Sequence, residues 1–293
     1  MIWLYRICHL YYLYAQRNFF LYLNPKTITH STSEKNMKCS TFVTVVLTGL
    51  IGLIICATVQ ARSLNDIQAD GTIIIATEGL NPPFNFYQDS QLTAFEIEIG
   101  EAVAKKMGLK VDWKTLAFDS LLSGLRQNRW DLVIASFGVT PRRAKAVKFT
   151  QPHYCSGAII VSKDKAALTM DGLKGKTVAV TSGTTNLQHV KKIPAIKNVK
   201  IFPMETDARA ALLNDRVDVW VVDRFAAKSA LDSGSSAGLM PGELLFTEKV
   251  ASAVKKDNAS LADAYNLALA KIMSDGTYKT ISDKYMKEDI RCK

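Results

Sequence analysis

The chain has 293 residues, of which 48% are hydrophobic and 22% are charged, and its formal net charge is +10. This is a globular composition, which excludes a disordered or fibrous chain, and at about 150 residues per domain the length suggests two domains. Five of the 37 basic and one of the 27 acidic residues lie in residues 1–61, which leaves 32 and 26, a net charge of +6, for residues 62–293. That excess includes no run of five or six like charges, so nucleic acid is not an expected partner.

Residues 37–61 carry the pattern of a secretory signal peptide. A basic residue precedes a nearly uncharged apolar stretch at residues 41–57, and small residues occupy the −3 and −1 positions of a cleavage site after Ala61. We therefore expect export to the periplasm. A transmembrane anchor is the alternative, because the apolar stretch could almost span a bilayer. A lipid anchor on Cys56 is a weaker one, because the residue before it is large.

Residues 1–36 are typical of neither a signal peptide nor a domain. They are apolar and aromatic, but charged and polar residues interrupt them. We interpret them as an upstream extension, with Met37 as the true start, and exclude them from the fold prediction.

Two of the five cysteines, Cys155 and Cys292, follow the predicted cleavage site. Because disulfides persist in exported proteins, a single bridge between the tail and the middle of the chain is possible. Two separate thiols are the alternative. His153 lies close to Cys155 in the sequence, but this cluster is too small to predict a metal site, and no cofactor is expected.

Residues 71–135 predict a parallel α/β unit. A β-branched apolar run forms the first strand, and apolar residues then recur at helical spacing before strand patterns return. The order strand, helix, strand, helix, strand is that of parallel α/β folds. The predicted strands are 71–76, 111–115 and 132–135, and the predicted helices are 94–107 and 120–127.

The same order recurs after residue 175. Residues 128–134 can be laid over residues 215–221, which puts Ser136 and Asp223 at equivalent positions just past two strand ends. We interpret this as two similar lobes; the alternative is that any turn from a helix into a buried strand looks alike. The predicted strands are 176–180, 199–202 and 217–222, and the predicted helices begin at residue 186 and span 206–213, 260–273 and 278–286.

Ligands of open α/β sheets bind beyond the carboxyl ends of the strands. The loops at those ends are rich in hydroxyl groups and glycines, with two acids and aromatic rings among them. This chemistry suits a small zwitterion better than a phosphate or a metal ion. The loops are 77–79, 116–118, 136–140, 181–185 and 223–224.

Residues 65–290 resemble the family 3 periplasmic solute-binding proteins, the polar amino-acid receptors of ABC importers. Seven short motifs carry the resemblance, and they keep the family's order and spacing. They are 77–79 through 83–86, 94–99, 131–143, 147–154, 173–176, 182–184 and 275–278.

The resemblance implies a type II periplasmic binding protein fold, an α/β architecture of two lobes. Each lobe is expected to be a mostly parallel sheet flanked by helices, and two crossings of the chain form a hinge. The expected crossings are 154–156 and 247–250, so the expected lobes are 62–156 with 251–293, and 157–250.

The resemblance also implies the charged ligand contacts. Arg143, with Arg142 as the alternative, matches the arginine that pairs with the ligand's α-carboxylate, since a planar guanidinium meets a carboxylate in two parallel hydrogen bonds. Asp223 matches the acid that pairs with the α-ammonium group, although capping a helix is its alternative role. Glu78 could hold the ammonium group or a cationic side chain; the alternative is a solvated acid at the rim.

The uncharged contacts come from four segments of the chain. Phe118 and Asn81 match positions where aromatic rings often sandwich the ligand side chain, and only Phe118 keeps a ring. Gly138 stands where family members often have Ser or Thr, so only its backbone contact is expected. The implied set also includes Ser136 and Phe137 from the loop of Gly138, and Thr184 and Thr185, which open a helix whose positive end favours an anion.

The function implied by the resemblance is that of an extracytoplasmic monomeric receptor. It would capture a polar amino acid by hinge closure and deliver it to an inner-membrane ABC permease. Glu78 together with Asp223 favours a ligand with a cationic or amide group, such as arginine, lysine, ornithine, glutamine, histidine or an opine. One alternative is an enzyme on the same fold, a cyclohexadienyl or arogenate dehydratase with Glu78 as general acid. A sensor module is a third class, which the end of the chain at Lys293 disfavours.

Overall fold

A computed structural model describes residues 61–234 and 238–292. The predicted upstream extension and almost all of the predicted signal peptide fall on residues 1–60, outside the described residues, so both stay predictions. Within the described ranges, no helix has the length and apolar character needed to cross a membrane.

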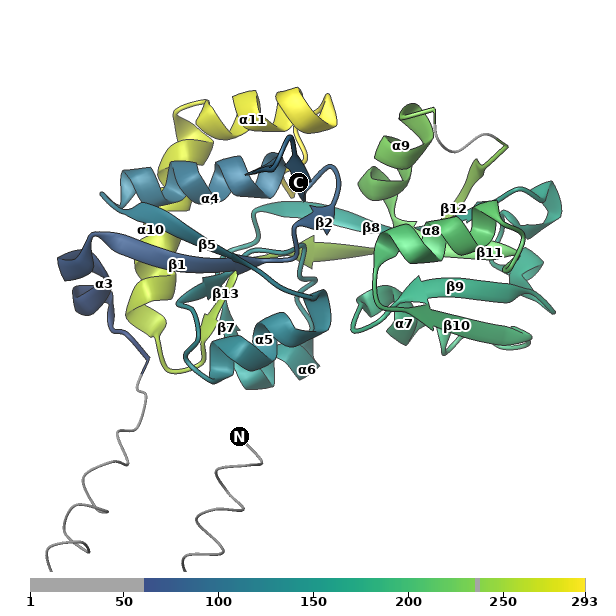
Figure 1. Cartoon of the computed structure of the whole chain (residues 1–293), viewed down its shortest axis with the longest axis horizontal. Helices are drawn as coiled ribbons and strands as arrows, with labels where there is room; N and C mark the ends of the chain where they lie inside the picture. The colour runs from purple at the N-terminus through teal and green to yellow at the C-terminus, as the bar shows by residue number, and fades with distance from the viewer. Residues whose placement is uncertain (1–60, 235–237, 293) are drawn as a thin grey trace, which may run out of the picture. The chain divides into compact units, whose positions relative to one another are not determined.

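The described residues form two lobes, each built on a five-stranded sheet (Figure 1). In the first lobe, β1 pairs in parallel with β5 and β6, as predicted, and β13 joins in the antiparallel direction between β6 and β7. The strands in spatial order are β5 (Lys110–Thr115), β1 (Thr72–Thr77), β6 (Leu132–Val133), β13 (Ala253–Lys255) and β7 (Val147–Phe149). Because β13 follows the whole second lobe in sequence, the tail completes the first sheet.

Helices cover both faces of the first sheet because side chains of β1 alternate between the faces. Ile73 and Ile75 pack with α4, α10 and α11, whereas Ala76 packs with α5 on the opposite face. The helices of this lobe are α3 (Leu64–Asp70), α4 (Phe95–Lys106), α5 (Phe118–Arg126), α6 (Pro141–Ala146), α10 (Ala259–Ser274) and α11 (Thr277–Met286).

The second lobe repeats this plan. The predicted parallel strands β10, β9 and β11 are neighbours, and the antiparallel strands β8 and β12 extend the sheet beyond β11. The strands in spatial order are β10 (Asn198–Phe202), β9 (Thr177–Thr181), β11 (Val219–Asp223), β8 (Tyr154–Ser162) and β12 (Met240–Val250). The helices are α7 (Thr185–Val190), α8 (Glu205–Leu213) and α9 (Arg224–Asp232), with 3₁₀ turns η1 (Lys165–Ala167) and η2 (Asp171–Leu173).

The expectation of mostly parallel sheets holds for three strands of each lobe. The remaining pairings are antiparallel, because one strand in each sheet runs against its two neighbours: β13 between β6 and β7, and β8 between β11 and β12. A separate three-stranded sheet of β2 (Leu80–Asn81), β3 (Asn85–Gln88) and β4 (Gln91–Thr93) was not predicted, since these strands are too short to carry a periodic pattern.

Strands β8 and β12 connect the two lobes. They pair in the antiparallel direction, and Tyr154 of β8 lies opposite Val250 of β12 where both leave the second sheet. In Figure 1, β8 runs from the first lobe into the second, and β12 runs back toward the first. The predicted crossings therefore fall at adjacent ends of two paired strands, while the predicted lobe boundaries stay a prediction.

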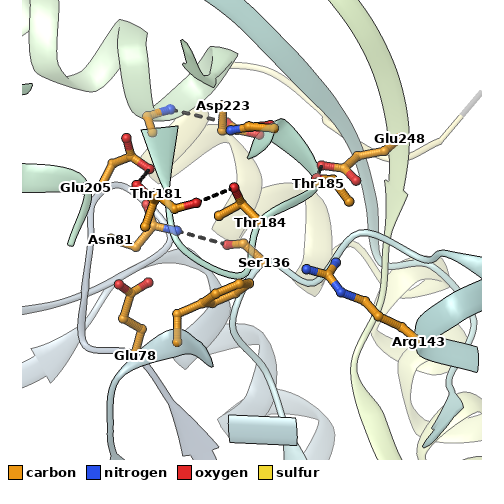
Figure 2. Close-up of a pocket in the computed structure, with 13 residues that line it drawn as sticks. Glu78, Asn81, Ser136, Arg143, Thr181, Thr184, Thr185, Glu205, Asp223 and Glu248 are labelled. Atoms are coloured by element: carbon orange, nitrogen blue, oxygen red, sulfur yellow. Dashed lines mark hydrogen bonds between the residues drawn. The ribbon is translucent and has the colours of Figure 1, made fainter. Parts of the chain in front are cut away.

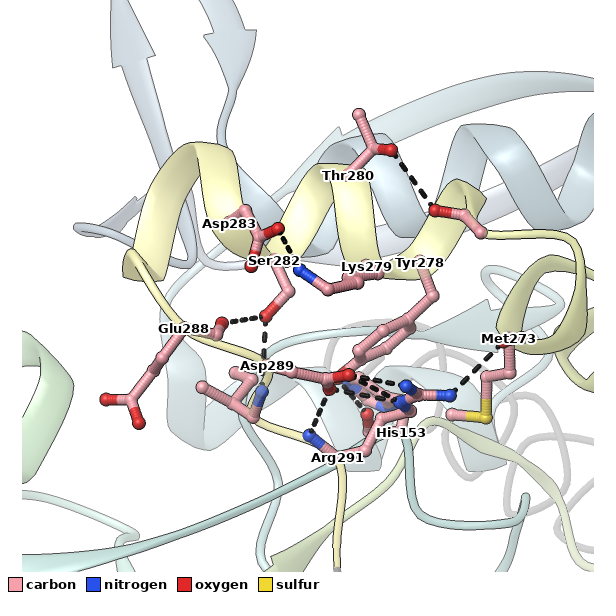
Figure 3. A network of polar contacts seen from close by, with 12 residues as sticks. His153, Met273, Tyr278, Lys279, Thr280, Ser282, Asp283, Glu288, Asp289 and Arg291 are labelled. Carbon is pink, nitrogen blue, oxygen red and sulfur yellow. Dashed lines mark hydrogen bonds and ion pairs between the residues drawn. The ribbon is translucent and has the colours of Figure 1, made fainter.

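A disulfide ties the tail to the first of these hinge strands. It joins Cys155 of β8 to Cys292, with Cα atoms 4.8 Å apart. Beside it, the Cys155 N–H donates a hydrogen bond of 3.1 Å to the carbonyl oxygen of Ile290. Arg291 in turn donates to the carbonyl oxygen of Met273, 3.2 Å away (Figure 3). The end of the described chain is thus held to both α10 and the hinge.

The two turns that the sequence overlay equates share their local structure. Asn128 and Asp215 both adopt left-handed backbone conformations, with φ of 60° and 55°. Three residues later, Asp131 and Asp218 each accept a backbone N–H from the neighbouring strand, β1 or β9, at 2.8 and 2.7 Å. The same device therefore sets the register beside Ser136 in one lobe and Asp223 in the other.

Candidate functional site

A pocket lies between the two lobes, at the strand ends where the sequence places the ligand contacts (Figure 2). It has about 550 Å³ of space not filled by atoms, part of it open to solvent. Eight of the ten predicted contact residues line this pocket. Those of the first lobe are Glu78, Asn81, Phe118, Ser136 and Arg143, and those of the second are Thr184, Thr185 and Asp223.

Phe137 and Gly138, the other two predicted residues, do not line the pocket but contact residues that do. The Phe137 ring stacks on Phe118 with centroids 4.3 Å apart, and the Arg143 guanidinium lies 4.8 Å from the Phe137 centroid. Stacking against rings restricts the guanidinium to one plane. The carbonyl oxygen of Gly138 accepts from the same guanidinium.

Arg143 connects the two lobes. It follows the Thr140 cap of α6, and its guanidinium nitrogens donate to the carbonyl oxygens of Gly138, at 2.7 Å, and Gly183, at 2.9 Å. These acceptors belong to different lobes. Burial lowers the pKa of Arg143 to about 10, which leaves the group charged at neutral pH. The alternative residue, Arg142, is exposed and does not line the pocket.

Asp223 has the capping role that the sequence suggested as its alternative, and it also lines the pocket. It ends β11 and caps α9, since one carboxylate oxygen accepts from the backbone N–H groups of Phe225, at 2.8 Å, and Ala226, at 3.3 Å. The other oxygen accepts from the Ser156 hydroxyl of β8. Burial raises the pKa of Asp223 to about 6. The cap therefore fixes an acid that also faces the pocket.

Glu78 is buried without a partner. It follows β1 directly, is 9% exposed, and makes no hydrogen bond or ion pair with any other residue in the described ranges. Burial, and then the acids Glu205, Glu96 and Asp119, raise its pKa to about 8. The expectation of a solvated acid at the rim does not match this position.

Ser136 is fixed by a buried acid that the sequence did not single out. The Ser136 N–H donates to Glu96 at 2.7 Å, and its hydroxyl donates to the same carboxylate at 3.2 Å. Asn81 then donates to the Ser136 hydroxyl at 3.3 Å. Since Ser136 has a positive φ of 51°, these bonds hold a backbone that L residues seldom adopt.

The two threonines of the second lobe use their hydroxyl groups within the protein. Thr184 caps α7 by accepting from the Leu187 N–H at 3.2 Å and donates to the Thr181 carbonyl oxygen at 2.7 Å. Thr185 donates to Glu248 at 2.9 Å. Both hydroxyl groups therefore have partners within the protein, and the predicted ligand contacts of the two threonines stay a prediction.

Five residues that line the pocket were not predicted as contacts. The two acids among them have raised pKa values of about 7, in each case mainly because of burial. Glu205 follows strand β10, so the rule that ligands lie at strand ends would have found it had the loop after 202 been included. Glu248 had no such signal, because it lies in a hinge strand. The five are Thr181, Asn186, Glu205, Ala226 and Glu248.

The lining is strongly acidic. Four carboxyl groups, those of Glu78, Glu205, Asp223 and Glu248, face one guanidinium. Such a set favours a ligand that brings positive charge. In the described part of the chain, no three or more His, Cys, Asp or Glu side chains are grouped as metal ligands would be.

The lobes also touch next to the pocket-lining residue Phe118. Ser182 of the second lobe donates to Asp119 of the first at 3.1 Å. Beside this bond, Gly183 has a φ of +73°, and an added Cβ would lie 3.2 Å from the Cβ of Asp119. A glycine therefore allows the second-lobe loop to approach the start of α5 closely.

The chain is similar to known proteins over most of its length. The model of the bacterial extracellular solute-binding proteins, family 3, matches residues 73–288. The probable amino-acid-binding protein YxeM of Bacillus subtilis (strain 168) is 31% identical, over 87% of this chain and 98% of that protein. The solved structure of an ancestral arginine-binding protein bound to arginine is 36% identical, with a TM-score of 0.71 over 73% of this chain and 98% of the other. An ancestral amino-acid-binding protein, described as a precursor of cyclohexadienyl dehydratase, is 27% identical, with a TM-score of 0.71 over 76% and 98%.

Proposed function

Because this chain belongs to family 3 of the bacterial extracellular solute-binding proteins, we propose that it is the receptor of an ABC importer for a cationic amino acid. Two lobes, two hinge strands and a polar pocket between the lobes suit that role. In this proposal the signal peptide directs the chain to the periplasm, where it acts as a monomer and delivers its ligand to an inner-membrane permease. Opines and amino acids with an amide side chain are the nearest chemical neighbours of this ligand class.

Arg143 and Asp223 are the proposed contacts for the two charged ends of the amino acid. Arg143 is buried and positively charged, and its guanidinium can turn from backbone carbonyls toward a carboxylate, which is the stronger acceptor. Asp223 lies on the other lobe and has an oxygen anchored by Ser156. A zwitterion between them would contact both lobes at once.

The burial of Glu78 is the observation that supports a ligand with a cationic side chain. A carboxyl group that is nearly buried and surrounded by acids is costly unless a cation compensates it. An ammonium or guanidinium group at the end of a ligand side chain would supply that compensation. The arginine-bound relative among the solved structures supports the same ligand class.

Ligand capture follows from the position of the contacts on two lobes. We propose that the amino acid first rests on Arg143, Ser136 and Phe118 and that the second lobe then adds Asp223 and the backbone at Thr185. A ligand shifts a conformational equilibrium only by binding one state better than the other. Shifting a balance from 1:99 to 99:1 needs about 5.5 kcal/mol of such a difference, which two charge pairs and several amide contacts can supply.

A thermal-shift screen of amino acids and opines tests this proposal. A ligand present at 100 times its dissociation constant adds about 2.7 kcal/mol to the free energy of unfolding. We expect arginine, lysine or ornithine to raise the melting temperature, and we expect Glu78→Gln to weaken this response. Glu288→Gln, which changes an exposed acid, is the matched control. A response to aspartate or glutamate alone would overturn the proposed cationic ligand class. The absence of a response to every compound would overturn the proposed receptor function.

A dehydratase is the second candidate, because the raised pKa of Glu78, about 8, keeps a proton available at neutral pH. One relative described as a precursor of cyclohexadienyl dehydratase gives this candidate a specific reason. Purified protein mixed with prephenate or arogenate would be monitored for an aromatic product. Turnover that disappears in Glu78→Gln would replace the receptor proposal with an enzyme.

A further inference from the structure

Glu248 reaches the pocket across the space that a side chain at position 138 would fill. A Cβ built on Gly138 would lie 1.7 Å from Oε2 of Glu248 and 2.5 Å from its Cδ. No side chain larger than a hydrogen atom can stand there while Glu248 keeps its place. The glycine and the acid are therefore a matched pair, one from a loop of the first lobe and the other from a hinge strand.

Glu248 also lies on the same face of the second sheet as Asp223, two residues along β12 from Phe246, which shares the register row of Asp223. Asp223 ends β11, and its carboxylate accepts from Ser156 of the adjacent strand β8. Ser156 is the register partner of Glu248 on β12, the next strand along. Side chains of directly opposed residues in an antiparallel pair point to the same face of the sheet. Both acids therefore face the pocket from the hinge side.

The charged neighbours of Glu248 come from both lobes. Burial raises the pKa of Glu248 most; the hydrogen bond from Thr185 and the charge of Arg143 lower it, and Asp223 raises it. Thr185 occupies Oε1, whereas Oε2 has no hydrogen-bond donor among the described residues. A glutamine would accept the Thr185 bond equally well and would avoid the repulsion from Asp223. The cost of an acid at this position points to a cation that it must bind.

We propose that Glu248 is a second acidic contact for the ligand's α-ammonium group, beside Asp223, and that Gly138 is required because it leaves room for the Glu248 carboxylate. The inference rests on the proposed function and deepens it. It makes the ammonium group a contact of the hinge strand itself, so ligand binding acts directly on a strand that connects the lobes.

The test combines a protein change with a ligand change. The variant is Glu248→Gln, which keeps the shape and the Thr185 bond. The probes are L-arginine and 5-guanidinopentanoic acid, which lacks only the α-ammonium group, and affinities are measured by calorimetry. If the screen instead selects lysine or ornithine, 6-aminohexanoic or 5-aminopentanoic acid replaces the second probe.

We expect Glu248→Gln to weaken the binding of L-arginine at least about tenfold and the binding of the deaminated compound less than about threefold. This difference isolates the coupling between Glu248 and the ammonium group. Equal effects on both probes, or no effect on either, would overturn the proposal. Wild-type protein that binds none of the amino acids would instead refute the receptor function, and the inference would fall with it.

Gly138→Ala tests the pairing separately. Its Cβ must displace Glu248, so we expect the same selective loss for L-arginine as in Glu248→Gln. In a Glu248→Ala background the displaced side chain is gone, and adding Gly138→Ala should change the affinity less than about threefold. A full additional loss in that background would show that Gly138 acts independently of Glu248 and would overturn the pairing.

Discussion

Replacing Glu78 by glutamine should remove a loss of stability at alkaline pH. The pKa of Glu78 rises from 4.5 to about 8 on folding, mainly because of burial. Between these two values the folded chain keeps a proton that the unfolded chain has released, so the free energy of unfolding falls as the pH rises. At about 1.4 kcal/mol per pH unit, the loss reaches about 5 kcal/mol by pH 9.

Separation of the two lobes would reduce this loss of stability. If the lobes separate in solution, water reaches Glu78 and the carboxylate ionises at lower cost. We therefore expect the free energy of unfolding of Glu78→Gln to exceed that of the wild type by about 2 to 5 kcal/mol at pH 9. At pH 5, close to the unfolded pKa, we expect the two values to agree within about 1 kcal/mol. The raised pKa values of Glu205, Asp223 and Glu248 act in the same direction and remain in the variant.

The assay is urea unfolding, followed by tryptophan fluorescence, at pH 5, 7 and 9, with the disulfide intact and no added ligand. Glu288→Gln is the control, because this acid is exposed, and we expect it to follow the wild type at every pH. If the free energies of unfolding of the wild type and Glu78→Gln changed with pH in the same way, the burial argument would be refuted and the main support for a cationic ligand removed.

Three further predictions follow from other contacts. The disulfide between Cys155 and Cys292 spans a sequence separation of 137 residues, for which the chain-entropy model gives about 5 kcal/mol; we expect the double serine variant to lose about 2 to 5 kcal/mol in urea unfolding, and a loss below about 1 kcal/mol would contradict this. A Cβ on Gly124 would lie 2.2 Å from the Trp130 ring, so Gly124→Ala should cost about 1 to 3 kcal/mol by overpacking, which an unchanged melting temperature would disprove. Arg143→Lys should weaken the binding of the ligand found in the screen by about tenfold or more, because one charge-assisted hydrogen bond of about 1.5 to 3 kcal/mol is lost. An unaltered dissociation constant in calorimetry would rule out the proposed carboxylate contact.

The sequence predicted the parallel core of each lobe because its signals are local. Strand β1 is a β-branched run, and the turns at Asn128 and Asp215 adopt the same conformation because each joins a helix to a buried strand. The antiparallel strands were harder to predict. Along β12, the alternation of half-buried and exposed positions is interrupted near Leu244, where its register with β8 shifts, so its pairing with β8 does not follow from its own pattern alone.

The candidate site shows the same limit. Residues just after predicted parallel strands, such as Glu78 and Asp223, were found because the carboxyl ends of those strands meet at one edge. Glu248 reaches the pocket from a hinge strand, and Glu96 acts through Ser136, 40 positions away in sequence. Neither position follows from spacing, because each depends on how two distant segments come together.

The returning tail has a consequence for the order of assembly. The second sheet uses one uninterrupted stretch of chain from β8 to β12, whereas the first sheet must wait for β13, and its helical cover for α10 and α11. Cys292, which closes the covalent link, emerges later still. During synthesis, where domains generally fold as they emerge, the lobe that begins first is therefore the last to be completed.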